Sequence, residues 1–150
     1  MHSRSTYKEG VQAALSIRQP WAELILSGRK SIEIRSWSTE YRGAVWLHTG
    51  QKRAPELDRQ FAIDTPFVGG FVGQVLITNV LRLDLDRWIR WRTRHLVEGP
   101  MPEEAYGWVL REPVRFVRPI PAPGELRLFY PSQGLEDILC KELSDSRHTS

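Results

Sequence analysis

The spacing of apolar residues changes several times along the chain, and each change predicts an element of structure. A short apolar run at 11–17 predicts a buried strand. Trp21, Leu24 and Ile25 then recur at the i, i+3, i+4 spacing of one helix face. Gly28 follows where a residue in the left-handed conformation would end that helix.

After this helix the period falls to two, which predicts strands. Ile32 and Ile34 point to one side, and a polar face with an aromatic tip points to the other, formed by Ser31, Glu33, Arg35 and Trp37. A second strand at 44–49 carries Ala44, Trp46 and His48 on one face.

The remaining pattern predicts several short elements. These are a short helix at 55–62, a long or bent strand at 68–83, a helix at 84–97 capped by Asp84 or Asp86, strands at 106–110, 114–117 and 126–130, and a closing helix at 135–143. We expect the three prolines of 119–124 to keep that segment out of a central strand.

Arginines and tryptophans separate on the helix predicted at 84–97. Arg87, Arg90 and Arg94 fall within about 60° of one another on a helical wheel, and the opposite side carries Trp88, Trp91, His95, Leu85, Ile89 and Leu96. The simpler interpretation is that the apolar side is buried and the arginines are solvated. The alternative is that the arginines follow phosphates.

The length and composition predict one globular domain. The chain has 150 residues, of which 41% are hydrophobic and 26% charged, and these fractions exclude disordered, collagen-like and coiled-coil classes. The polar segments 1–12 and 144–150 are predicted to be flexible tails around a domain at 13–143. Six or so short strands with few helices predict an α+β fold, a small mixed β-barrel with short flanking helices.

Cysteine and histidine usage argues against disulfides and metals. Cys140 has no partner cysteine, and four histidines with one cysteine give no zinc-ligand spacing, so we expect no metal or cofactor. The N-terminus lacks the apolar stretch of a signal peptide, and no apolar run is long enough to cross a membrane. We therefore expect a monomer in the reducing cytoplasm.

Charge gives a weak indication of the partner. The net charge is +3, and four of the 21 basic residues are lysines, which leaves 17 arginines. The planar guanidinium binds phosphates and stacks on bases. The excess of basic residues lies in the first third of the chain, which favours a polyanionic partner there.

The turn and strand after Gly28 carry the most specific chemistry. Glu33 and Arg35 lie side by side on one strand face, and Lys30 can turn toward the same carboxylate, which should favour the protonated ammonium. With Trp37 at its edge, this group offers donors, an acceptor and an aromatic face, which an unstacked nucleobase needs. An ordinary surface row of ion pairs would have the same sequence. The helix start beside Arg18 could also bind an anion, or Pro20 could simply begin the helix.

The stretch L-S-I-R-Q-P-W-A-E-L-I-L-S-G-R-K-S-I-E-I-R-S-W, followed by Y-R-G-A-V-W-L-H-T, resembles the ASCH domain family of the PUA-like superfamily. The family signature G-x-K-x-x-E-x-R is present as Gly28, Lys30, Glu33 and Arg35, and later segments at 106–110 and 119–126 resemble the family's closing strands. The resemblance implies a small barrel with a cleft between the first helix and the sheet, where relatives bind RNA, DNA or nucleotides.

The resemblance and the residues together predict a module that binds RNA, single-stranded or end-exposed DNA, or a nucleotide. The candidate binding residues are Arg18, Gln19, Trp21, Lys30, Glu33, Arg35, Trp37, His48, Lys52 and Arg53. Lys30, Arg35, Arg18 and Lys52 are predicted to contact phosphates or base acceptors, Glu33 an exocyclic amine, and Trp37 a base. His48 either faces the cleft or is a core histidine, and Trp46 and Tyr106 are further aromatic candidates.

The family also includes enzymes, so we keep a catalytic alternative. One branch deacetylates N4-acetylcytidine with a Lys, a Thr and a Glu. Its Lys corresponds to Lys30, but its Thr position carries Glu33, and Ser31 is the nearby hydroxyl. Glu33 would then activate water while Lys30 polarises the amide. A ribonuclease at Lys30 and Glu33 has no histidine pair or metal cluster in the sequence to support it.

Overall fold

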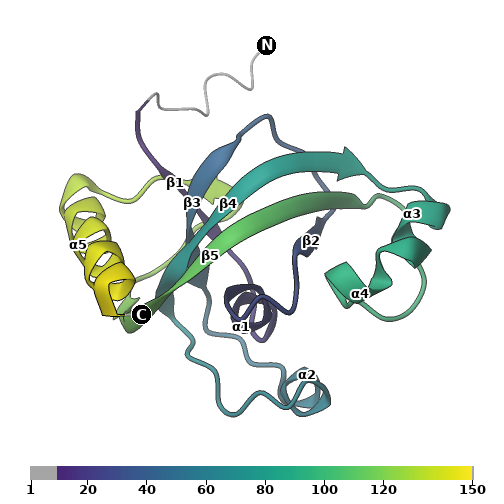
Figure 1. Ribbon diagram of the computed structural model, residues 1–150, viewed down its shortest axis with the longest axis horizontal. Coiled ribbons are helices and arrows are strands. Elements are labelled where there is room, and N and C mark those ends of the chain that lie inside the picture. The colour runs from purple at the N-terminus through teal and green to yellow at the C-terminus, as the bar shows by residue number, and fades with distance from the viewer. Residues whose placement is uncertain (1–9, 150) are drawn as a thin grey trace.

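A computed structural model describes residues 10–149, where six strands form one curled sheet with helices around it (Figure 1). The sheet order is β2 (Ile32–Arg35), β5 (Tyr106–Pro121), β4 (Gly70–Arg82), β3 (Gly43–Thr49), β1 (Ala13–Ser16) and β6 (Leu128–Phe129). The helices are α1 (Trp21–Leu26), α2 (Pro55–Gln60), α3 (Leu85–Arg90), α4 (Arg92–His95) and α5 (Gln133–Thr149). Because β1 runs parallel to β3 and the other pairs are antiparallel, the sheet is mixed, and the predicted α+β fold is confirmed.

The inner strands are almost continuously apolar because both faces of the sheet are covered. Val45 and Leu47 of β3 belong to the cluster inside the curl of the sheet, together with residues of α1. Trp46, between them in sequence, points to the opposite face and packs with Phe71 and with Leu139 of α5. In Figure 1, α5 lies at one end of the sheet, and α3 and α4 lie at the other end.

Close backbone approach and register shifts bend the two long strands. A Cβ atom on Gly73 of β4 would lie 2.2 Å from the carbonyl oxygen of Val114 on β5, so no larger residue fits without movement. The pairing of β4 with β5 shifts register at three places. These shifts curl the sheet into a half-barrel, and the sequence-based expectation of close approach at the glycines of this strand is confirmed.

The strand pattern at 106–121 differs from the prediction. The separate strands expected at 106–110 and 114–117 are one strand, β5, which extends through Pro121 and pairs with Gly70. The start of 119–124 therefore belongs to the sheet, but it pairs with β4 alone and is not central, as the prolines predicted. Because β2 pairs only with 106–109, the later part of β5 is an edge, where proline is tolerated.

The helix predicted at 84–97 is two short helices. The Asp84 cap is confirmed, because its side chain accepts a hydrogen bond of 2.8 Å from the backbone N–H of Arg87. Trp88 is buried with Leu83 and Ala105 in a small cluster. Leu85 and Ile89, predicted on the buried side, are 59% and 57% exposed. This small cluster accommodates one large side chain of α3 and leaves these two residues in solvent.

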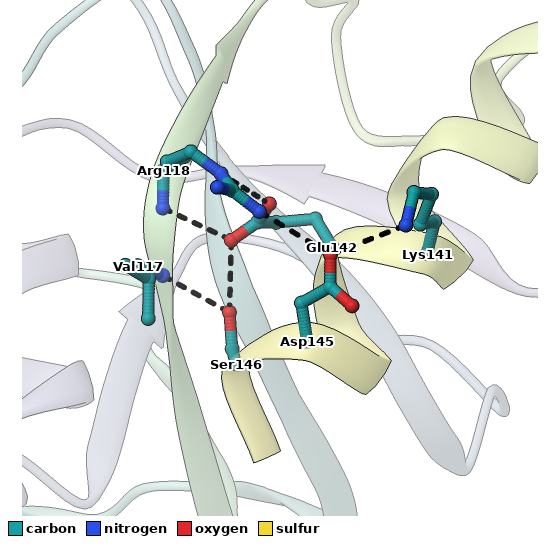
Figure 2. A network of polar contacts seen from close by, with 6 residues as sticks. All are labelled: Val117, Arg118, Lys141, Glu142, Asp145 and Ser146. Carbon is teal, nitrogen blue, oxygen red and sulfur yellow. Dashed lines mark hydrogen bonds and ion pairs between the residues drawn. The ribbon is translucent and has the colours of Figure 1, made fainter. Parts of the chain in front are cut away.

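Helix α5 is longer than predicted because polar groups of β5 bind its last turns (Figure 2). The Glu142 carboxylate accepts hydrogen bonds of 3.0 Å from the backbone N–H of Arg118 and from the Ser146 hydroxyl. Ser146 in turn accepts from the N–H of Val117, and the Arg118 guanidinium reaches Asp145 at 3.2 Å. Helix therefore continues through 144–149, which the sequence analysis assigned to a flexible tail.

We predict that Glu142→Gln makes folding less stable and less sensitive to acid. Burial by itself raises the pKa of Glu142, but the hydrogen bonds from Arg118 and Ser146 outweigh it, and the pKa lies below its ordinary value. The carboxylate therefore stabilises the fold above the unfolded-state pKa of about 4.3, and this contribution is lost as the pH falls through the folded-state pKa. Urea unfolding near pH 7 should show a loss of about 1–3 kcal/mol.

The same urea unfolding experiment, repeated at lower pH, compares the acid sensitivity of the variant with that of the unmodified protein. The stability difference between Glu142→Gln and the unmodified protein should shrink steadily below about pH 4. Exposed Glu98, changed to Gln, is the control and should follow the unmodified protein. Parallel acid sensitivity of all three proteins would contradict the role given to Glu142.

Candidate functional site

A cleft of 520 Å³ opens beside α1, between the end of β1, the strand β2 and two loops. The loops are the one after β3 and the one before β6. Its volume is within the range of about 300–1,000 Å³ that is usual for small-molecule sites. The lining residues are Ser16, Arg18, Trp21, Glu33, Ile34, Arg35, His48, Gly50, Gln51, Lys52, Gly124, Glu125, Leu126 and Arg127.

The cleft lies where the sheet does not close on itself. Three strands, β5, β4 and β3, separate β2 from β1 in the sheet order. Arg35 of β2 nevertheless donates a hydrogen bond of 2.7 Å from Nη2 to the backbone carbonyl of Ser16 on β1. One side chain therefore joins two strands that do not pair with each other.

The three charged residues of the signature lie together, as the sequence predicted. The Glu33 carboxylate is 6% exposed, with Oε1 at 3.7 Å from Lys30 Nζ and Oε2 at 3.1 Å from Arg35 Nε. The contact between Glu33 and Arg35 Nε is an ion pair without a hydrogen bond, because the N–H of Nε is not aligned with an acceptor. The carboxylate thus lies between two cations and keeps one face on the cleft.

Lys30 lies beneath the cleft rather than in its wall. The side chain is almost fully buried, and its Nζ donates to the carbonyl of His95 and lies 4.6 Å from the centre of the Trp21 ring. Burial lowers the pKa of Lys30, although the Glu33 carboxylate acts in the opposite direction. The predicted contact between Lys30 and a phosphate does not fit this position, because the ammonium is already surrounded by protein groups.

The start of α1 has internal partners where we expected an anion site. Gln19 is 2% exposed, its amide donates to the Phe67 carbonyl, and its oxygen accepts from the backbone N–H of Glu23, both at 2.9 Å. Gln19 therefore fixes the first turn of the helix and does not face a ligand. Arg18 is exposed and Trp21 half-buried, and both line the cleft.

Two further candidates lie outside the cleft lining. The Trp37 ring packs edge-on against Trp108 at 4.8 Å, and the Arg127 guanidinium lies 4.6 Å from its centre. Arg53 donates to the carbonyl of Pro66. Its neighbour Lys52 is exposed within the cleft, so of these three predicted residues only Lys52 faces the cavity.

His48 is both a core residue and part of the cleft wall. It is 2% exposed, with Nδ1 at 2.9 Å from the Ser16 hydroxyl and Nε2 at 2.8 Å from the Ala122 carbonyl. Burial lowers its pKa, while the Ala122 carbonyl acts in the opposite direction. Trp46 is buried, and Tyr106 lies under Arg82 away from the cleft.

The sequence analysis missed part of the lining. Ser16 comes from the strand end that the analysis treated as core, and the loop before β6 contributes Glu125, Leu126 and Arg127. Leu126 is 91% exposed. The proline-rich sequence of this loop carries no periodicity that could predict its fold back over β1. The one signal in the sequence is that Ser16 is a polar residue near the end of an apolar run, two positions before Arg18.

The described residues carry no metal cluster and no membrane helix. Within 10–149, no three His, Cys, Asp or Glu side chains gather closely enough to hold a metal ion. No helix in that part of the chain is sufficiently long and apolar to span a bilayer.

Comparison with protein families gives one match. The model of the ASCH domain family matches residues 15–120, which include the whole of the signature and most of the sheet. The chain belongs to the ASCH domain family. This family has a PUA-like fold and is generally associated with RNA binding.

Solved ASCH structures share the fold at low sequence identity. The crystal structure of ASCH from Zymomonas mobilis superposes with a TM-score of 0.60 at 18% identity, covering 87% of this chain and 94% of that one. A single-residue variant of that protein gives a TM-score of 0.61 with 96% of its chain covered. This similarity shows the fold.

Activating signal cointegrator 1 from mouse and from human contains a similar segment. Both proteins are 42% identical to this chain over 53 residues. That segment is 33% of this ASCH chain and 9% of either cointegrator. The ASCH chain therefore corresponds to a small part of those proteins.

We predict that replacing two lysines near the cleft changes stability by very different amounts. Lys30→Met leaves the buried Glu33 carboxylate with one cation fewer and should lower the free energy of unfolding by about 3–5 kcal/mol. Lys52→Met, at an exposed position of the same cleft, should change it by less than about 0.5 kcal/mol. Urea unfolding measures both, and a Lys30→Met protein as stable as the unmodified one would show that the buried ammonium does not hold the cluster.

Proposed function

We propose that this ASCH domain binds RNA, or single-stranded or end-exposed DNA, in the cleft beside α1, with phosphates at the rim and a base on the floor. The observation that carries the proposal is the charge of the lining. Four basic side chains, Arg18, Arg35, Lys52 and Arg127, face two acidic ones, Glu33 and Glu125. Buried Lys30 and Arg35 already balance Glu33, so the cleft attracts anions. We expect this binding to occur in the cytoplasm.

The exposed cations suit phosphates. Arg18, Lys52 and Arg127 are exposed in the lining, where long basic side chains can follow a flexible backbone. Contacts of this type fix the register of a nucleic acid without reading its sequence, and they make affinity fall as salt rises.

The inner wall suits a base. Trp21 is the tryptophan of the lining, and an indole face there offers stacking of roughly 1–3 kcal/mol per base. Glu33 keeps an acceptor toward the cavity and can bind an exocyclic amino group. Trp21 therefore takes the stacking role that the sequence analysis assigned to Trp37.

Binding has more support than hydrolysis at Lys30 and Glu33. An amidohydrolase would need the Lys30 ammonium at the substrate carbonyl, but Nζ is bonded to the His95 carbonyl and covered by Trp21. Incubation with N4-acetylcytidine, or with a single-stranded RNA, should leave both molecules intact. Appearance of cytidine or of cleaved RNA would replace the binding proposal by an enzymatic one.

We predict that arginines of the cleft, and not those of α3, bind the nucleic acid. Arg18→Gln should weaken binding to a short single-stranded RNA roughly tenfold and reduce the salt dependence by about one phosphate contact. Arg90→Gln is the matched control, because Arg90 is exposed on α3 and pairs with Asp86 at 2.8 Å. Fluorescence anisotropy over a range of salt concentrations measures both variants, and the same sequence as DNA measures the preference for RNA.

The opposite order of effects in these two variants would place the binding site elsewhere. A loss of affinity in Arg90→Gln with none in Arg18→Gln would overturn the cleft as the binding site. It would favour the alternative in which the arginines of α3 and α4 follow the phosphates.

A further inference from the structure

Ser16 and His48 form a hydrogen-bonded pair in the wall of the cleft. They are direct neighbours on the parallel strands β1 and β3. The Ser16 Oγ lies 2.9 Å from His48 Nδ1, and the other ring nitrogen, Nε2, lies 2.8 Å from the carbonyl oxygen of Ala122. Both side chains line the cavity, and neither has a role in the phosphate contacts described above.

The Ala122 carbonyl decides which atom of the pair donates. A carbonyl oxygen can only accept, so Nε2 carries the proton of the neutral imidazole, and Nδ1 has a lone pair and accepts. The ring is buried edge-on between Phe71 and Phe129, at 5.0 and 5.9 Å, and this burial favours the neutral form by lowering the pKa. The hydroxyl proton of Ser16 is therefore donated to Nδ1.

The pair is held rigidly. Arg35 donates to the Ser16 carbonyl at 2.7 Å, and the backbone N–H of Ile17 donates to the His48 carbonyl at the same distance. Gly124 lies against the ring, where a Cβ atom would be 2.4 Å from it, so the imidazole cannot rotate freely. The orientation of the Ser16 hydroxyl is thus set by the fold before any ligand arrives.

A serine whose proton is already donated offers only lone pairs to a ligand. Within residues 10–149, His48 is the hydrogen-bond partner of Ser16 Oγ, and the oxygen has acceptor capacity left. The Glu33 carboxylate is a second acceptor on the same wall, and Arg35 contacts both residues. Two acceptors in the lining of one cavity favour a ligand group with N–H donors and disfavour a carbonyl oxygen.

We propose that Ser16, oriented by His48, is a specificity-determining residue that selects bases carrying an amino group, cytosine and adenine, over uracil and hypoxanthine. The two bases of each pair have nearly the same shape. They differ in an amino or an oxo group and in the adjacent ring nitrogen, which accepts in cytosine and adenine and carries a proton in uracil and hypoxanthine. The inference rests on the proposed function and deepens it, because phosphate contacts and stacking treat the members of each pair alike, and Ser16 adds a second acceptor to that of Glu33.

The experiment compares pentacytidylate with pentauridylate, and pentaadenylate with pentainosinate, at fixed salt by calorimetry. The unmodified protein should prefer the amino member of each pair by roughly 5- to 150-fold, which corresponds to leaving one polar group unpaired. Ser16→Ala should lower both ratios several-fold, to the part that the Glu33 carboxylate contributes, and Ser16→Thr, which keeps a hydroxyl, should retain the full preference. Thermal unfolding of each variant shows that it is folded.

The outcomes separate this inference from the proposed function. Equal affinity for both members of each pair in the unmodified protein overturns the role of Ser16 but not the proposal that the cleft binds RNA. This measurement needs no variant. A preference that is undiminished in Ser16→Ala also overturns it. Absence of binding to all four RNAs overturns both proposals.

Discussion

The hydrogen bond from Arg35 to the Ser16 carbonyl is the contact on which the rest of the structure depends. A sheet that closes by strand pairing satisfies its edges with backbone hydrogen bonds and leaves no opening. Here β2 and β1 are joined by a guanidinium instead. The opening that remains beside it has one charged and one neutral acceptor on its wall, Glu33 and Ser16. The incomplete barrel is therefore the reason that a polar cleft exists at all.

The charge balance around this contact explains why a lysine is buried in a small domain. Glu33 is almost inaccessible and lies between Arg35 and Lys30. An ammonium removed from water is unfavourable unless it gains partners. Lys30 gains three: the Glu33 carboxylate, the His95 carbonyl at the end of α4 and the Trp21 ring of α1. The same ions thus connect β2 to two helices and set the polarity of the cleft.

The sequence predicted the parts of the fold that depend on local spacing. The alternation at 31–37, the glycine after α1 and the Asp84 cap all follow from short-range geometry. The three charges of the signature share a strand and the turn before it, so their proximity also followed. Their burial did not, because the same spacing fits an exposed row of ion pairs. Long-range strand pairing could not be predicted either. β5 continues through prolines because β2 is too short to pair with its later part, and no local sequence pattern indicates the length of that pairing.

The pair of Ser16 with His48 shows the same limit most clearly. These residues are 32 positions apart and meet only because β1 and β3 pair in parallel in one register. From the sequence, His48 could be either a core residue or a residue that faces the cleft. In the structure it is both, since it is buried and lines the cavity. The loop that supplies the Ala122 carbonyl has no periodicity, so the partner that sets the imidazole tautomer was beyond sequence reasoning.

The most direct test of this account is to map bound RNA onto the isotope-labelled protein by NMR. If RNA binds in the cleft, pentacytidylate should shift the backbone amide signals of Ser16, Arg35, His48 and Gly124, which line the cavity beside β1 and β2. Signals of α3 and α4 should stay in place. Shifts confined to Arg87, Arg90 and Arg94, with the four signals around the opening unchanged, would contradict it.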